Sequence, residues 1–72
     1  MTYEYLPEDD IYVIQAELPE GVKGFCKEVD TYRYAVVNEE LEDEEKLKTA
    51  EHEIRHLKNG DLDKEFDELS VL

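Results

Sequence analysis

The stretch "DEEKLKTAEHEIRHLKNG", residues 43–60, decides the fold class because it carries the strongest helical pattern in the chain. The pattern predicts a helix from residue 42 or 43 to about Asn59. Asp43 is the predicted N-cap, acidic residues follow in the first turn, and Gly60 is suited to end the helix. Apolar residues at spacings of three and four predict one stripe that packs on the rest of the domain, namely Leu47, Ala50, Ile54 and Leu57.

The same helix carries both histidines of the chain in the motif "HEIRH", residues 52–56. Because residues four apart stack on one helix face, the side chains of His52 and His56 can reach one metal ion. At about 100° per residue, this face lies nearly opposite the predicted apolar stripe. The pattern H-E-x-x-H predicts a Zn²⁺ site in which Glu53 acts as general base on a metal-bound water.

A catalytic zinc ion needs a third protein ligand, and the sequence leaves its identity open. The chain has no third histidine, and Cys26 is far away in sequence and fits a small buried residue better than a ligand or nucleophile. The candidates are the carboxylates that follow the motif helix: Asp61, Asp63, Glu65 and Glu68. We favour Glu68, then Glu65 and then Asp61, because a last helix over residues 63–72 could fold back across the metal.

The first half of the chain has the composition of a β-sheet. Aromatic and β-branched residues predict strands over residues 11–18, 25–29 and 32–38, with a tight turn at Asp30 and Thr31 between the last two. Strands followed by helices indicate an α+β fold. We therefore predict one domain over residues 1–72, with a small, about three-stranded antiparallel sheet, the long H-E-x-x-H helix and a short C-terminal helix.

Charge and composition restrict the partners. The chain has 72 residues and a net charge of -13, which argues against binding to nucleic acid or to an anionic membrane through its general surface. The single cysteine excludes an intrachain disulfide. The sequence shows neither a signal peptide nor a segment long enough to span a membrane, so we expect a cytoplasmic protein.

From "LPEGVKGF" through "YAVVNEELEDEEKLKTAEHEIRHLKNGD", about Leu18 to Asp63, the chain resembles the small ImmA/IrrE-type metallopeptidases of bacteria and mobile elements. The resemblance implies a gluzincin-like protease that cleaves helix-turn-helix repressors, with His52 and His56 as zinc ligands and Glu53 as general base. The chain also departs from that family. Arg55 stands where many longer members have glycine, and the alanine-rich segment that carries their third ligand is absent.

Two functions of different classes remain open. The first is a zinc-dependent endopeptidase acting on a protein, possible substrates including a DNA-binding repressor, with the substrate held along an edge strand at Tyr32–Asn38. The alternative is a non-catalytic acidic binding module or regulatory partner that retains the minimal zincin fold and binds a basic protein. Tyr32 and Tyr34 share a strand face and would either cover the sheet or contact a substrate. The oligomeric state is left open.

Overall fold

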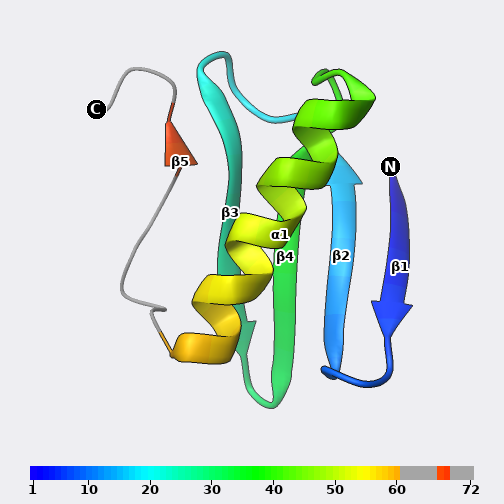
Figure 1. Cartoon of the computed structure of the whole chain (residues 1–72), viewed down its shortest axis with the longest axis vertical. Helices are drawn as coiled ribbons and strands as arrows, with labels where there is room; N and C mark the ends of the chain where they lie inside the picture. The colour runs from blue at the N-terminus through cyan, green and yellow to red at the C-terminus, as the bar shows by residue number, and fades with distance from the viewer. Residues whose placement is uncertain (61–66, 69–72) are drawn as a thin grey trace.

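The computed structural model describes residues 1–60 and 67–68, which form a small α+β domain with one helix laid across one face of a mixed sheet (Figure 1). The elements in chain order are β1 (Thr2–Leu6), β2 (Ile11–Ala16), β3 (Val22–Val29), β4 (Tyr32–Asn38), α1 (Asp43–Asn59) and the two-residue β5 (Asp67–Glu68). Within these described residues, no helix has the length and apolar character needed to cross a membrane.

The sheet has the strand order β1-β2-β4-β3-β5, and its pairing is mixed. β1 runs antiparallel to β2, β3 runs antiparallel to β4, and β2 and β4 run parallel. The predicted three-stranded antiparallel sheet is therefore wrong. The chain leaves β2, forms β3 one strand further out, and returns through a hairpin at Asp30 and Thr31, so that β4 fills the space beside β2.

The prediction that β4 is an edge strand is wrong. β2 and β3 hydrogen-bond to β4 on either side, so Tyr32–Asn38 cannot accept a substrate strand.

The predicted C-terminal helix over residues 63–72 lies outside the described residues except at Asp67–Glu68. These two residues form β5 against β3 and are not helical.

The helix has the bounds that its sequence predicts, but it begins differently. Asp43 is its first residue, and the N-cap is Glu42, which makes no side-chain capping hydrogen bond. Three acidic residues in the first turn still lie favourably against the helix dipole. At the other end, Gly60 has φ 77°, a left-handed conformation that glycine adopts without steric cost, and this residue ends the helix as predicted.

The helix is rotated relative to the predicted apolar stripe. Thr49, Glu53 and Leu57 face the sheet and are 5%, 2% and 3% exposed, whereas Leu47 is 62% exposed. Ala50 and Ile54 are only half-buried beside this inner face. Leu57 belongs to the core, which also contains Ile11, Cys26 and Ala35.

The rotation follows from a close approach at Gly24 of β3. A Cβ atom at Gly24 would lie 2.8 Å from Thr49 Cγ2 and 2.5 Å from the carbonyl oxygen of Val36. Only a residue without a side chain leaves room there for the threonine methyl group. The contact seats the helix on β3 with Thr49 inward, and the residues one and two turns later, Glu53 and Leu57, must then face inward too.

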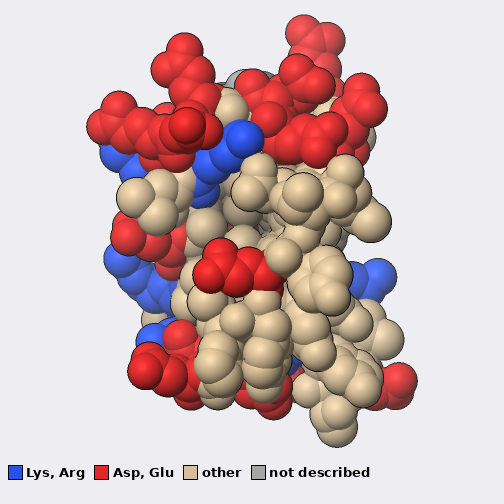
Figure 2. Space-filling model, turned by 90° about the vertical axis from the view of Figure 1, so that its right-hand side faces the viewer, with Lys and Arg blue, Asp and Glu red and all other residues tan. Residues whose placement is uncertain are grey.

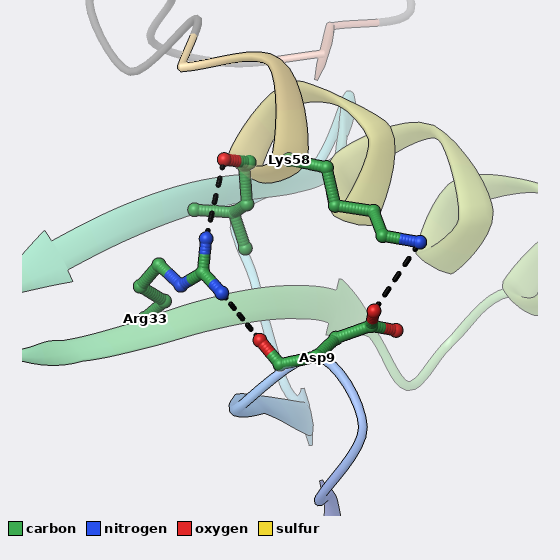
Figure 3. Close-up of polar contacts among 4 residues, drawn as sticks. Asp9, Arg33 and Lys58 are labelled. Atoms are coloured by element: carbon green, nitrogen blue, oxygen red, sulfur yellow. Dashed lines mark hydrogen bonds and ion pairs between the residues drawn. The ribbon is translucent and has the colours of Figure 1, made fainter.

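Polar contacts fix the C-terminal end of α1 to the sheet (Figure 3). The Arg33 guanidinium on β4 donates to the carbonyl oxygen of Leu57 at 3.5 Å and also to the carbonyl oxygen of Asp9 in the β1–β2 turn. Lys58 Nζ lies 3.3 Å from Asp9 Oδ1. A cation at the last carbonyls of a helix is favourable, so Arg33 joins the helix, the central strand and the turn.

We expect the Gly24→Ala substitution to destabilise the protein by about 1–3 kcal/mol, because the added methyl group would lie 2.5 Å from the Val36 carbonyl oxygen and 2.8 Å from Thr49 Cγ2. Urea unfolding followed by circular dichroism measures this loss. Lys27→Ala on the same strand is the control, since Lys27 is exposed and its loss should change the free energy of unfolding by less than about 0.5 kcal/mol. Equal stabilities of the two variants would contradict the close approach at Gly24.

Candidate functional site

The two histidines of the motif lie side by side on α1. His52 Nε2 and His56 Nε2 are 2.9 Å apart, and the ring planes are almost perpendicular at 88°. His52 is exposed and His56 is half-buried. Two imidazole nitrogens on one tetrahedral zinc ion, each about 2.0–2.1 Å from the metal, are separated by about 3.3 Å. The pair is in hydrogen-bond contact, and its nitrogens are closer together than two ligands of one zinc ion would be.

Glu53 occupies a different environment from the two histidines. It is 2% exposed and lies in the inner stripe of the helix between Thr49 and Leu57, against the sheet. A general base must reach its proton directly or through one water molecule. The structure places the motif glutamate inside the helix–sheet interface and the exposed imidazole of His52 outside it. The role of Glu53 as general base stays a prediction.

The described residues do not complete the zinc ligand set. In residues 1–60 and 67–68, no three histidine, cysteine, aspartate or glutamate side chains converge on a point that could hold a metal ion. Glu68, the favoured third ligand, lies in β5, where its backbone pairs with Val22. Asp61, Asp63 and Glu65 lie outside the described residues. A catalytic zinc ion needs three protein ligands, so no reaction step can be derived through a metal from these residues.

Cys26 lies on β3 and is 6% exposed. Its neighbours in the core are Ile11, Ala35 and Leu57, all buried and apolar. Burial among apolar side chains makes a thiol unreactive. The prediction of a small buried residue is confirmed.

The side of the sheet that α1 leaves uncovered carries all five tyrosines. Gly24 faces α1, so its sequence neighbour Phe25, and Val36 opposite Phe25, face the other way. Because strand side chains alternate between the two faces, Tyr34 and Tyr32 lie on this uncovered face with Val36. The register then adds the remaining three: Tyr12 is paired with Tyr34, Tyr5 is paired with Tyr12, and Tyr3 is two residues before Tyr5. We call this surface the tyrosine face.

The rings of the tyrosine face form one cluster around Tyr12. Its centroid lies 4.8 Å from that of Tyr5, 5.8 Å from Tyr34, 6.1 Å from Tyr32 and 6.2 Å from Tyr3. These separations are typical of aromatic pairs that stabilise one another. The cluster is nevertheless open to solvent, since Tyr3 is 73% exposed, Tyr32 is 52% exposed and Tyr5 is 42% exposed.

One phenol of the cluster is held by a neighbouring acid. The Tyr5 hydroxyl donates a 2.8 Å hydrogen bond to Asp10 Oδ1. This hydrogen bond, followed by partial desolvation and the negative charge of Asp10, raises the pKa of Tyr5 above its usual value. Asp10 therefore orients the Tyr5 hydroxyl at one margin of the tyrosine face.

Only part of this surface was predicted from the sequence. Tyr32 and Tyr34 were expected on one strand face, but β1 and the parallel pairing of β2 with β4, which bring the other three tyrosines beside them, were not predicted. The alternation in "TYEYL", residues 2–6, is the signal that could have revealed β1.

Comparisons of the chain with protein-family models, with curated proteins and with solved structures found no match. The resemblance to the ImmA/IrrE-type metallopeptidases rests on the residues of the H-E-x-x-H helix and its flanks, and it stays a prediction.

The buried position of Glu53 predicts a large difference between two charge-matched substitutions. Glu53→Lys places an ammonium group in the helix–sheet interface and should cost more than about 2 kcal/mol of unfolding free energy. Glu51→Lys changes the net charge equally at an exposed position and should cost less than about 0.5 kcal/mol. Urea unfolding of both variants measures the difference. Similar stabilities would mean that Glu53 faces solvent, as a catalytic base requires.

Proposed function

We propose that the protein is a non-catalytic binding module that docks on a basic protein partner through its tyrosine face. The observation that carries the proposal is the separation of its surface into an aromatic face, which carries Lys27 opposite Tyr34, and a remainder rich in exposed carboxylates. Figure 2 views the molecule from the side of β1 and shows a largely uncharged area between Asp and Glu side chains at the top and bottom, with a further acidic group in its middle. Tyrosine is enriched in protein interfaces because its large ring loses little conformational entropy and its hydroxyl still finds a partner.

The tyrosine face is smaller than a standard protein interface, so a partner that docks on it must also contact the surface around it. A strand spacing of about 4.8 Å and a rise of about 3.3 Å per residue give the face a footprint of about 300–400 Å². Apolar patches of this size on a monomer are often functional. A standard protein interface takes about 800 Å² from each partner, so a stable complex must also cover the surrounding surface.

The surrounding surface is acidic at both ends of the sheet. Exposed carboxylates lie in the β1–β2 and β3–β4 turns at one end, at Glu8, Asp10 and Asp30, and in the β2–β3 loop at the other, at Glu17 and Glu20. A partner with lysine or arginine around an apolar centre complements this pattern. A second copy of the chain does not, because each copy carries a net charge of -13.

We expect the Tyr32→Asp variant to lose binding of the partner and the Leu47→Asp variant to keep it. Both substitutions introduce one carboxylate at a site that is more than half exposed, but Tyr32 lies on the tyrosine face and Leu47 lies on α1. Immobilised wild type and both variants are used to retain proteins from an extract of the source cells, and each retained protein is identified by mass spectrometry. Binding of the purified partner is then measured by calorimetry.

The proposal predicts an identified basic protein whose affinity falls at least about tenfold with Tyr32→Asp and stays within about twofold with Leu47→Asp. Loss of the partner with Leu47→Asp alone would place the interface on the helix. A self-association in sedimentation equilibrium that Tyr32→Asp abolishes would show that a second copy occupies the face. Either result would overturn the proposal.

A zinc-dependent endopeptidase is the second candidate function, and the position of both imidazoles side by side on one face of α1 supports it. Under this function, His52 and His56 would be metal ligands, Glu53 would be the general base, and the substrate would be a protein such as a helix-turn-helix repressor. The proposed third ligands remain Glu68, Glu65 and Asp61.

Calorimetric titration with Zn²⁺ tests the histidine pair. We expect the wild type to take up zinc, His52→Ala and His56→Ala each to lose this uptake, and Glu53→Gln to keep it, because Glu53 is not a proposed ligand. Equal uptake by the wild type and the two histidine variants would exclude the site. Cleavage of a repressor by the zinc-loaded wild type, but not by Glu53→Gln, would favour the peptidase over the binding module.

A further inference from the structure

The tyrosine face contains a shallow pocket of about 260 Å³. It is lined by Met1, Tyr3, Tyr12, Ile14, Tyr32 and Tyr34. Pockets for small-molecule ligands are generally about 300–1,000 Å³, so this pocket suits the end of a single side chain better than a whole metabolite. No Asp, Glu, Lys or Arg side chain lines it. The one cationic residue in the lining is Met1, whose α-ammonium group lies 3.9 Å from Glu39 Oε1.

Three of the rings form a triangle that can receive a cation. The centroids of Tyr12, Tyr32 and Tyr34 lie 5.8 Å, 6.1 Å and 6.5 Å from one another, and the rings are tilted by 31° to 54°. A group above the centre of this triangle is within about 6 Å of every centroid, which is the range of a cation–π interaction. Tyr3 on β1 closes one side of the pocket.

The charge of the protein selects the sign of the occupant. With 21 acidic and 8 basic residues, the chain attracts cations and repels anions. Because no carboxylate lines the pocket, the aromatic rings are the local source of attraction, and the acidic turns provide the longer-range attraction. An apolar side chain in the pocket would be stabilised by burial, but it would not be attracted by the aromatic rings' electrostatic potential or by the acidic turns.

Among cationic side chains, arginine fits this environment best. Its guanidinium group is planar, stacks on aromatic rings and is less strongly hydrated than the lysine ammonium group, so its desolvation costs less. Resting on the proposed function, we propose that the pocket between Tyr3, Tyr12, Tyr32 and Tyr34 receives an arginine side chain of the basic partner. The tyrosine face thereby selects partners with an exposed arginine within an apolar surface.

Three short peptides test the proposal without knowledge of the partner. They have the form acetyl-Gly-Ser-X-Ser-Gly-amide, with X as arginine, lysine or citrulline, the last being an uncharged analogue of arginine. Each is titrated into the wild-type protein, and the tyrosine ring signals are followed by NMR. We expect saturable shifts at Tyr12, Tyr32 and Tyr34, with arginine binding about threefold or more tighter than lysine and citrulline weaker still.

Matched variants locate the site. Tyr32→Phe keeps the aromatic ring and should bind the arginine peptide within about twofold of the wild type, whereas Tyr32→Leu should bind it about fivefold or more weakly. Leu47→Ala is the control, because Leu47 is exposed on α1, away from the tyrosine face. Circular dichroism of each variant confirms folding, which the 52% exposure of Tyr32 favours.

Equal affinities for arginine and citrulline, or for Tyr32→Phe and Tyr32→Leu, would overturn the arginine pocket. This failure is distinct from failure of the proposed function. If Tyr32→Asp abolishes binding of a basic partner but the peptides show no preference for arginine, the docking face stands and the arginine pocket is excluded. If the peptides show a preference for arginine but no protein partner depends on the tyrosine face, the arginine pocket stands and the proposed function fails.

Discussion

The packing of α1 against Gly24 is the constraint on which the other features of the structure depend. The threonine methyl group at position 49 occupies space that any side chain at position 24 would fill. This contact fixes both the distance of the helix from the sheet and its rotation about its own axis. Glu53 consequently lies inside the interface, Leu47 lies in solvent, and His52 remains exposed beside the interface.

A single helix can cover only one face of the sheet, so the seating of α1 also determines which surface is left open. Alternation along the strands sends Ile11, Cys26, Ala35 and Val37 toward the helix. The same alternation sends the five tyrosines to the opposite side. Tyrosine suits such a surface because its ring packs on its neighbours while its hydroxyl remains hydrated. The packed core on one side and the open tyrosine face on the other are thus two consequences of one strand register.

Much of the local structure could be predicted from the sequence, because it depends on local signals. The bounds of α1 follow from acidic residues at its start and Gly60 at its end, and the hairpin follows from strand-forming residues around Asp30 and Thr31. The rotation of α1 could not be predicted in this way. Hydrophobicity favours Leu47 over Glu53 as an inner residue, and only a distant glycine on another strand reverses that order.

The sheet order and the candidate site depended on similar non-local information. The parallel pairing of β2 with β4 has no local sequence signal, so three antiparallel strands were the simplest expectation and were wrong. The H-E-x-x-H spacing did predict that the imidazoles of His52 and His56 would meet, because residues four apart on a helix always stack. It could not predict that Glu53 would be buried or that the tyrosines of β1, β2 and β4 would form one face.

The most direct test of this account is a nuclear Overhauser spectrum of the isotope-labelled protein, which reports which helix side chains touch the sheet. The account predicts strong cross-peaks between the Thr49 methyl group and the Gly24 α-protons, and none between the Leu47 methyl groups and any strand. Cross-peaks from Leu47 to the strands, with none between Thr49 and Gly24, would contradict it. The helix would then have the rotation that hydrophobicity alone suggests, with Glu53 turned toward solvent.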